Sequence, residues 1–333
     1  MKKQIKKIAI VRLSALGDIV NSAVVLQFIK NTYPNVQIEW FSESVFAPLL
    51  QNHPLIDTIH SINLKEIKKE KSLSKLMQLI KKLKAYNDYD LVIDMQGLIK
   101  SAVVARLLSP NIHGFDKHST RESLASLFYK TTSSIPYDAN VIKRNCKVVA
   151  DALQLEITES MLTGKEAVFP QLHSFVLPHN KPNIAFVIGA SWQSKKYPKE
   201  LVAKVCHALD ATCHIIWGNN TEHEEAKWIE AHTHNATLAP KLSLEELVSF
   251  ISNIDLVIGN DTGPTHIAWA QNIPSITLLG PTTSRMIGQT PKNIAIKSPS
   301  KVNILKIDKN DFSIKEIKPE VIIQHAKELL CNT

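Results

Sequence analysis

Residues 256–269, which read LVIGNDTGPTHIAW, hold the side chains of this sequence whose types and spacing best suit chemistry. The stretch starts with the apolar, largely β-branched residues expected of a short buried strand. Turn formers and helix-capping residue types occupy 259–264, and the apolar pattern of a helix resumes at His266. A strand, a polar turn and a helix in this order leave backbone N–H groups unpaired at the helix start, where they favour an anion.

Asp261 stands at this helix start, and a carboxylate does not bind an anion. Beside a phosphate site it suits hydroxyl groups better, so the stretch indicates a ligand with both a phosphate and a polyol part, such as a nucleotide sugar. The alternative is that Asp261 only caps the helix. The residues of this stretch leave both interpretations open.

Length and composition indicate a globular protein of two domains. The chain has 333 residues, more than one hydrophobic core usually serves, and 44% of them are hydrophobic and 21% charged. No apolar run approaches the ~18–20 residues of a membrane-spanning helix. The basic start resembles a signal peptide, but Arg12 interrupts its apolar run and no small-residue cleavage site follows, so we expect a first strand there.

Several classes of site lack their sequence signatures. No G-x-G-x-x-G follows the first expected strand and no G-x-x-x-x-G-K-[ST] occurs, which weakens dinucleotide and P-loop interpretations. No His or Cys cluster has metal-ligand spacing, so a tightly held metal is not expected. The four cysteines form neither a close metal-type pair nor a disulfide framework, and a reducing cytoplasm fits them best.

The net charge of +8 is unevenly distributed along the chain. Residues 1–170 hold 23 Lys and Arg against 16 Asp and Glu, whereas residues 171–333 hold 16 against 15. The first half should therefore meet something acidic, such as a nucleic acid, an anionic membrane or a charged acceptor, unless it is only a solvated basic surface. It contains no aromatic-rich stacking motif of the kind that binds RNA, so no nucleic acid is expected.

Short apolar runs alternate with segments of helical periodicity through the whole chain, which predicts an α/β protein with parallel sheets covered by helices on both faces. Strands are expected at 7–11, 36–41, 57–62, 90–95, 184–188, 214–217, 256–258 and 275–279. Helices are expected at 19–30, 72–86, 98–108, 141–153, 200–209, 226–232, 244–251 and 319–330.

The helix expected from Ser72 onward is basic and amphipathic. Its apolar side chains fall on one face and its lysines elsewhere: Leu73, Leu76, Leu79, Ile80 and Leu83 against Lys75, Lys81, Lys82 and Lys84. Such a helix is either an ordinary outer layer of an α/β domain or a segment that lies on a membrane surface, and the pattern does not decide between them.

Three prolines and little periodicity over residues 169–183 predict a linker between two domains. We therefore expect an N-terminal domain over 1–168 and a C-terminal domain over 183–318. Residues 319–333 are expected to form a C-terminal helix with the option of packing back towards the N-terminal domain.

Ligands of open parallel sheets bind beyond the carboxyl ends of the strands, where the strand order switches. These ends are predicted at 14–18, 96–97, 189–196, 218–225, 259–266 and 280–284. Among them, Lys195 is the obvious cation for a pyrophosphate leaving group, and Glu222 is placed to bind a ribose. His266 is singled out because it lies one turn inside the anion-binding helix.

Three segments carry a resemblance to a known family: RLSALGDIVNSAVVLQFIK (12–30), DMQGLIKSAVVARL (94–107) and GNDTGPTHIAWA (259–270). They resemble the ADP-heptose:lipopolysaccharide heptosyltransferases of glycosyltransferase family 9, over essentially the whole chain. RESLASLFY (121–129) and GFD (114–116) are similar to the heptosyltransferase I group in particular. The resemblance implies a GT-B fold, in which two Rossmann-like domains enclose a central interdomain cleft with the active site.

The resemblance also implies an activity and a role for individual residues. The activity is inverting transfer of L-glycero-D-manno-heptose from ADP-heptose to Kdo of Kdo2-lipid A, in lipopolysaccharide inner-core biosynthesis. Asp18, in the early Gly-Asp motif, is implied as the base on the acceptor hydroxyl and Lys195 as the group that stabilises the leaving diphosphate. Asp18 has a structural alternative as the N-cap of a helix starting at Ile19. The remaining implied contacts are to the donor, by Ser191, Glu222, Asp261, Thr262, Gly263 and His266, and to the acceptor, by Ser14, Gly17, Arg121 and the basic residues around 65–69.

One loop departs from the family pattern. Relatives often carry a Thr pair and a basic residue after the strand that ends at Ile188, where this chain has Gly-Ala-Ser-Trp over 189–192 and Ser191 as the only hydroxyl. The resemblance implies no tightly bound cofactor, with a divalent cation as an optional stimulant. It also implies a cytoplasmic protein, peripheral on the inner membrane, whose basic first half receives the Kdo carboxylates and lipid A phosphates.

Three other functions compete with this one. The nearest is another family 9 enzyme that adds a later core heptose, like heptosyltransferase II. A non-catalytic nucleotide-binding α/β protein would bind ADP without turnover. A Rossmann oxidoreductase is disfavoured by the missing glycine fingerprint.

Overall fold

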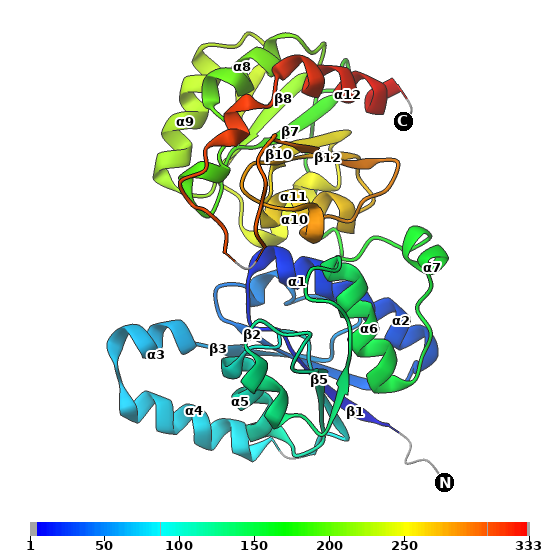
Figure 1. Cartoon of the computed structure of the whole chain (residues 1–333). Helices are drawn as coiled ribbons and strands as arrows, with labels where there is room; N and C mark the ends of the chain where they lie inside the picture. Colours follow the sequence, from blue (N-terminus) through cyan, green and yellow to red (C-terminus); the bar gives the residue numbers. More distant parts are fainter. Residues whose placement is uncertain (1–4, 87, 305, 332–333) are drawn as a thin grey trace. The chain divides into compact units, whose positions relative to one another are not determined.

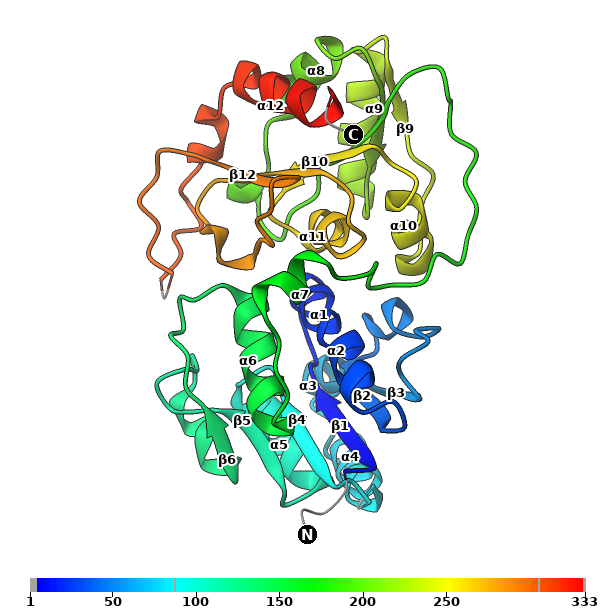
Figure 2. The same cartoon turned by 90° about the vertical axis from the view of Figure 1, so that its right-hand side faces the viewer.

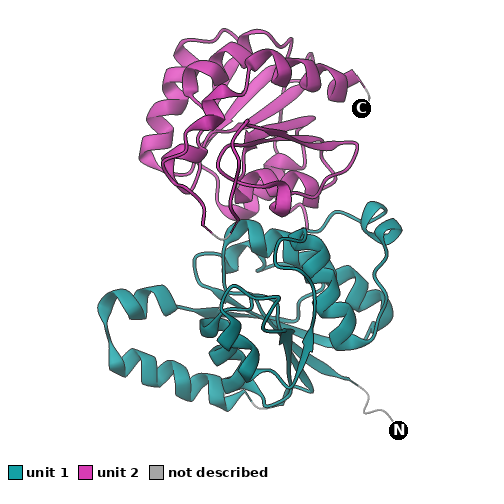
Figure 3. Ribbon diagram, viewed as in Figure 1, with its two compact units in different colours: residues 1–168 teal, residues 169–333 magenta. Residues whose placement is uncertain are grey.

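The structure, a computed structural model, describes residues 5–331 except 87 and 305. Residues 1–4, 332 and 333 of the expected domain ranges lie outside the described residues. The chain divides into two compact units, Met1–Val168 and Phe169–Thr333 (Figure 3). The first unit ends where the expected N-terminal domain ends.

Unit 1 is built on a parallel sheet of the order β3-β2-β1-β4-β5-β6. Its strands are β1 (Lys7–Val11), β2 (Gln37–Glu43), β3 (Thr58–Ile62), β4 (Leu91–Asp94), β5 (Ile112–Phe115) and β6 (Thr131–Ser133). The central strands β1 and β4 are buried along almost their whole length, because helices cover both faces of the sheet.

The helices of unit 1 form two layers on its sheet (Figure 1). On one side α1 (Leu16–Ala23) and α2 (Val25–Thr32) pack against α6 (Val141–Leu153), and on the other α4 (Leu73–Ala85) packs against α5 (Ile99–Leu108). Shorter elements complete the unit: η1 (Ala47–Leu49), α3 (Leu64–Glu70), η2 (Ser123–Phe128) and α7 (Glu159–Thr163). The single helix expected over 19–30 is therefore two helices. The first starts earlier than expected, at Leu16, and the two meet at Val24.

Unit 2 repeats the plan of unit 1 with the order β12-β11-β10-β7-β8-β9. Its strands are β7 (Asn183–Val187), β8 (Thr212–Ile216), β9 (Ala236–Leu238), β10 (Leu256–Asn260), β11 (Ser275–Leu279) and β12 (Asn293–Lys297). Counted within each unit, both sheets have the strand order 3-2-1-4-5-6 of the Rossmann fold, and the predicted α/β class with parallel sheets is confirmed.

Two helical layers also cover the sheet of unit 2 (Figure 2). The layer of α8 (Lys199–His207), α9 (Asn220–Ala231) and α12 (Pro319–Cys331) lies opposite that of α10 (Leu244–Ile251) and α11 (Gly263–Ala270). Three single turns, η3 (Gln193–Lys195), η4 (Ser284–Met286) and η5 (Ser313–Glu316), lie in its loops. The expected C-terminal helix forms as α12, and its Ile322 and Ala326 are buried in the core of unit 2. Its packing back towards the N-terminal domain stays a prediction.

The segment expected to link the two domains belongs to unit 2. The N–H of Phe169 donates to Gln271 Oε1 at 2.9 Å, and the N–H groups of Leu172 and His173 both donate to Ser249 Oγ at 3.1 Å. The ring of Phe175 then packs edge-on against Phe250 at 5.2 Å between centroids. Residues 169–182 are irregular, as expected, but they are tied to α10 and α11 and do not form a free linker.

The switch in strand order lies between β1 and β4 in unit 1 and between β7 and β10 in unit 2. Parallel strands on either side of such a switch send their next helices to opposite faces, which leaves a crevice at their carboxyl ends. The loops that meet there start at Arg12 and Met95 in unit 1 and at Ile188 and Asp261 in unit 2. Both aspartates that sequence analysis singled out lie in or next to these loops.

His53 is a buried imidazole of unit 1 that contacts Val168, the last residue of that unit. Its Nε2–H donates to the carbonyl of Val168 at 2.7 Å, and its Nδ1 accepts from the N–H of Leu55 at 3.2 Å. Burial lowers the pKa of His53 from 6.5 to about 4, against the smaller opposing effect of the bond to Val168. The unfolded chain therefore takes up a proton at a higher pH than the folded one does.

This difference predicts an acid-sensitive unit 1. Between pH 6.5 and about 4 the unfolded state binds the extra proton, so lowering the pH through this window should cost up to about 3 kcal/mol of unfolding free energy. Urea unfolding of the chain at a series of pH values measures the slope of the unfolding free energy against pH. His53→Gln should flatten it, and an unchanged slope in that variant would mean that other groups cause the acid sensitivity.

Candidate active site

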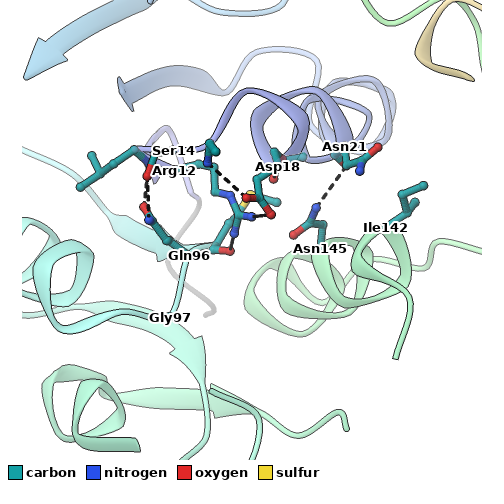
Figure 4. Close-up of polar contacts among 12 residues, drawn as sticks. Arg12, Ser14, Asp18, Asn21, Gln96, Gly97, Ile142 and Asn145 are labelled. Carbon is teal, nitrogen blue, oxygen red and sulfur yellow. Dashed lines mark hydrogen bonds and ion pairs between the residues drawn. The ribbon is translucent and has the colours of Figure 1, made fainter. Parts of the chain in front are cut away.

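The carboxylate of Asp18 is fixed at the carboxyl end of β1 (Figure 4). Its Oδ1 forms an ion pair with the guanidinium of Arg12, and its Oδ2 accepts the N–H of Ala15 at 3.1 Å. Arg12 is only 6% exposed, and it also donates from Nη1 to the carbonyl of Met95, after β4. The side chain of Asp18 is 29% exposed, so a held carboxylate remains open to solvent and keeps lone pairs for a further proton.

The structural alternative for Asp18 needs a correction. Helix α1 begins at Leu16, with Ala15 as its N-cap, so Asp18 is the third residue of the helix and does not cap one that starts at Ile19. Its carboxylate nevertheless accepts the N–H of the N-cap residue, which is one half of a capping box. Helix capping and an accessible carboxylate are therefore compatible at this position.

Ser14 is the centre of a second set of contacts at the same switch point. Its Oγ accepts from Gln96 Nε2 at 3.2 Å and from Lys100 Nζ at 3.1 Å. Gln96 also accepts the N–H of Leu13 with its Oε1 at 2.9 Å, so it joins the loops after β1 and β4. With two donors already on its oxygen, the Ser14 hydroxyl is left to donate its own proton to a ligand.

A buried aspartate supports the loop that carries Gln96. Asp94, the last residue of β4, accepts the N–H groups of Gln96 and Gly97 and the hydroxyls of Ser101 and Tyr129 at 2.8–3.2 Å. Burial raises the pKa of Asp94 and outweighs the opposing effect of these bonds. Gly97 has a positive φ of 68°, and a side chain there would also meet Thr120 and Phe115, so the turn requires glycine.

The two other predicted acceptor residues lie on the same unit but differ in setting. Gly17 is buried in the first turn of α1, next to Asp18. Arg121 is exposed in the loop before η2. The neighbouring Glu122 accepts the N–H of Ile99 at 2.7 Å, which ties this loop to the start of α5.

In unit 2, the structure brings three predicted residues into direct contact. Lys195 Nζ donates to Asp261 Oδ2 at 2.9 Å, and His266 Nε2 lies 3.2 Å from Asp261 Oδ1. The side chain of Asp261 is 5% exposed. Burial acts to raise its pKa, but the bond from His266 and the charge of Lys195 outweigh burial, and the pKa of Asp261 is well below its usual range.

This geometry decides the alternative for Asp261. Helix α11 begins at Gly263 with Thr262 as its N-cap, so Asp261 precedes the cap and its side chain turns to Lys195 and His266. The interpretation as a helix cap alone is wrong. Thr262 and Gly263 form the helix start as expected, where backbone N–H groups suit a phosphate.

Four buried donors in the loops at the carboxyl ends of strands of unit 2 have no hydrogen-bond partner among the described residues. They come from the loops after β7, β10 and β11: Trp192 Nε1, Ser194 Oγ, Thr262 Oγ1 and Thr282 Oγ1. Buried polar atoms normally have partners, so a cluster of unpaired ones at the carboxyl ends of strands is what a ligand with many acceptor oxygens would satisfy.

The departure of the 189–192 loop from the family pattern has a structural answer. Ser191, the one hydroxyl expected to serve there, is exposed, whereas Ser194 is fully buried one turn later. The carbonyls of Ile188 and Gly189 both accept from Asn260 Nδ2, which joins the loop to the end of β10. The buried donors of this loop are therefore Trp192 and Ser194, not Ser191.

Glu222 lies against the same loop. It is in the first turn of α9, which begins at Asn220, earlier than the expected 226. Its carboxylate accepts the N–H of Gly218 at 2.8 Å and contacts Gly189 so closely that a Cβ there would be 2.8 Å from its oxygens. The ends of β7 and β8 thus meet at Glu222, whose contact with a ribose stays a prediction.

Sequence analysis missed Arg12, Gln96 and Lys100 as members of the site. Arg12 was taken only as an interruption of an apolar run, although it is the first residue after β1. The loop at 96–97 was placed at the switch point, but the partner of Gln96 is 82 residues away in the chain. The signal available was position: each of these residues follows directly or closely on one of the two strands at the switch.

No group of three or more His, Cys, Asp or Glu side chains is placed to hold a metal ion in the part of the chain that the structure describes. Within residues 5–331, omitting 87 and 305, no helix combines the length and apolar character needed to cross a bilayer.

Comparison with known proteins agrees with this geometry. The sequence profile described as Glycosyltransferase family 9 (heptosyltransferase) matches residues 76–314. Lipopolysaccharide heptosyltransferase 1 of Campylobacter coli is 42% identical over 97% of this chain and 98% of its own length. Its namesake in Escherichia coli K12 is 26% identical over 91% of this chain and 96% of its own length.

A solved structure shares the fold. The E. coli heptosyltransferase WaaC with ADP-2-deoxy-2-fluoro heptose superposes with a TM-score of 0.80 at 23% identity, over 97% of this chain and 99% of that one. The predicted GT-B fold and the resemblance to the heptosyltransferase I group are confirmed. The chain therefore belongs to glycosyltransferase family 9, the heptosyltransferases.

Proposed function

We propose that this glycosyltransferase moves L-glycero-D-manno-heptose from ADP-heptose to Kdo of Kdo2-lipid A, with inversion at the anomeric carbon. The relative at 42% identity is named lipopolysaccharide heptosyltransferase 1, which supports heptose transfer in lipopolysaccharide synthesis, and the similar WaaC structure holds an ADP-heptose analogue, which supports the donor. The single observation that carries the proposal is the Asp18 carboxylate, held by Arg12 at the β1/β4 switch point and still open to solvent.

The reaction needs a base at the acceptor hydroxyl and stabilisation of the diphosphate that leaves the anomeric carbon. Asp18 takes the proton from the acceptor hydroxyl, whose oxygen forms the new bond to the anomeric carbon while the bond from that carbon to the phosphate oxygen breaks. The departing ADP carries negative charge. Lys195 Nζ and the N-terminus of α11 are suited to stabilise that charge. Asp261 and His266 then suit the sugar hydroxyls, and Glu222 the adenosine ribose.

No tightly bound cofactor takes part in this proposal, because both halves of the reaction are supplied by side chains and backbone N–H groups. A divalent cation serves only as an optional stimulant, which a comparison of rates with excess EDTA and with added Mg²⁺ would reveal. The enzyme is proposed to work in the cytoplasm, peripheral on the inner membrane, where a lipid acceptor lies.

The test is transfer from ADP-heptose to Kdo2-lipid A, compared with transfer to a core that already carries one heptose. Preference for Kdo2-lipid A is expected. Transfer only to the heptosylated core would move the chain to the later step of the same family. ADP binding without transfer to either acceptor would leave a nucleotide-binding protein and overturn the proposal.

A further inference from the structure

The hairpin of α3 and α4, residues 64–85, carries most of the net charge of the chain. It holds eight lysines against two glutamates, a net charge of +6 compared with +8 for all 333 residues. Of the eight, only Lys75 forms an ion pair within the described residues, with Glu70 at 2.6 Å and Glu66 at 3.8 Å. The other lysines leave a concentrated positive potential, which attracts an anionic partner.

Helix α4 presents apolar side chains in two directions. Leu79 and Leu83, four residues apart, pack on the core of unit 1. Leu73 and Met77, also four residues apart, are 77% and 63% exposed. Only Leu83 of this helix is buried, and Leu73, Leu76 and Met77 are exposed to solvent.

Lysines share this outward face of α4. Met77, Lys81 and Lys84 follow one another at spacings of four and three residues, so their side chains lie in one row along the helix. All three side chains are exposed. Exposed apolar residues with basic residues beside them are typical of a helix that lies in the interface of an anionic bilayer.

Neighbouring elements extend the exposed apolar surface. Twelve large apolar side chains are exposed among the described residues, and seven of them belong to α4, α5 and η2. Helix α5 packs against both α4 and η2, so these elements adjoin one another in unit 1. The seven are Leu73, Leu76, Met77, Ile99, Val103, Leu124 and Leu127.

This surface also adjoins the candidate active site of unit 1. Ile99, the first residue of α5, is exposed, and the next residue is Lys100, whose Nζ donates to Ser14 Oγ. Ile99 is also joined to the Arg121 loop through its bond to Glu122. An amphiphile bound at the α5 end of this surface would have its polar part beside the loops that hold Asp18.

We propose that α4, α5 and η2 form the surface by which unit 1 docks on a bilayer that contains anionic lipid. The lysines of the α3–α4 hairpin, which projects from the unit (Figure 1), lie at the headgroups, while Leu73 and Met77 insert their side chains into the interface. The inference rests on the proposed function in one respect: docking here lets a lipid acceptor reach Asp18 without leaving the membrane.

Co-sedimentation of the full chain with vesicles tests the surface without any substrate. We expect the chain to bind vesicles of phosphatidylcholine with about 30% phosphatidylglycerol, to bind pure phosphatidylcholine far less, and to be released by salt. Lys81→Gln with Lys84→Gln should weaken binding about 30-fold, as two fewer lysines at an anionic surface predict. Leu73→Ser with Met77→Ser should weaken it about tenfold or more.

Matched variants in unit 2 serve as controls. Lys204→Gln with Lys241→Gln removes the same charge, and Leu172→Ser with Val176→Ser removes two other exposed apolar side chains. Equal losses in the hairpin variants and these controls would overturn the proposal, as would equal binding to both kinds of vesicle. A change of oligomeric state in Leu73→Ser with Met77→Ser, without a change in vesicle binding, would assign the face to a second copy of the chain and overturn it too.

A deacylated Kdo acceptor separates this proposal from the proposed function. The hairpin variants should transfer heptose to it at the unmodified rate, but lose transfer to Kdo2-lipid A embedded in anionic vesicles. No transfer by the unmodified chain to either the deacylated acceptor or Kdo2-lipid A would refute the activity, whereas vesicle binding would still report on the surface.

Discussion

Asp18→Asn is expected to lower heptose transfer by about a hundredfold or more while the affinity for ADP stays unchanged. The amide has the shape of the carboxylate and still offers an oxygen to the N–H of Ala15, so α1 should keep its start. It cannot take a proton from the acceptor hydroxyl, and it no longer balances the charge of Arg12. Single-turnover transfer and ADP titration measure the two effects separately.

Asp138→Asn is the matched control, because Asp138 is an exposed carboxylate of the same unit outside the candidate site. It should leave both transfer and ADP affinity unchanged. Transfer that survives in Asp18→Asn would reduce Asp18 to its capping role in α1 and require another base. A variant that also loses ADP affinity would indicate a folding defect instead of a missing base.

The strand–turn–helix units at the two switch points were largely predictable from the sequence. The runs Ile8–Val11 of β1 and Leu256–Ile258 of β10 are apolar because central parallel strands are buried on both faces, and the turns after these strands are rich in polar residues. The start of α1 was not predictable in the same way. Its N-cap is Ala15, which has no capping side chain, so the helix signal becomes visible only further along at Ile19.

Outer strands were harder to predict than central ones. Four strands were missed: β5 and β6 in unit 1, and β9 and β12 at the two edges of the sheet of unit 2, whereas the edge strand β3 was predicted. Strand β9 has three residues, and β12 is only half-buried over most of its length. Neither offers the continuous apolar run that identified β7 and β10, because one face or one edge of each remains near solvent.

Side-chain partners depend on which loops the fold brings together, and these partners could not be predicted from the sequence. Arg12 and Met95 are 83 residues apart, and Lys195 and Asp261 are 66 apart. Spacing along the chain identifies positions at the ends of strands, but only the strand order shows which of those ends are neighbours. The position of Lys195 after a strand indicated its role, the resemblance to a family supplied that of Asp18, and the structure added Arg12 and Gln96 as the groups that hold the first site in place.

Lys195→Met is expected to destabilise unit 2 and to abolish useful transfer. The substitution leaves the carboxylate of Asp261, 5% exposed, with His266 as its remaining partner. Breaking a buried ion pair by removing one partner costs about 3–5 kcal/mol, which should lower the unfolding midpoint of this unit by roughly 10 °C. Calorimetry of the full chain measures the shift, and ADP-heptose turnover measures the loss of the cation at the leaving diphosphate.

The loss of stability in Lys195→Met should depend on pH in a definite direction. In the unmodified chain the pKa of Asp261 is lowered, so the stability from its ionised form is complete above the unfolded value near 3.9 and is lost only at still lower pH. Without Lys195, the burial that opposes ionisation of Asp261 is less well compensated. The difference in unfolding free energy between Lys195→Met and the unmodified chain should therefore narrow as the pH falls and the carboxyl of Asp261 takes up a proton. Lys195→Met combined with Asp261→Asn should regain most of the stability but none of the transfer. A double variant no more stable than Lys195→Met would show that the lost stability came from the packing of the lysine and not from the charge left behind on Asp261.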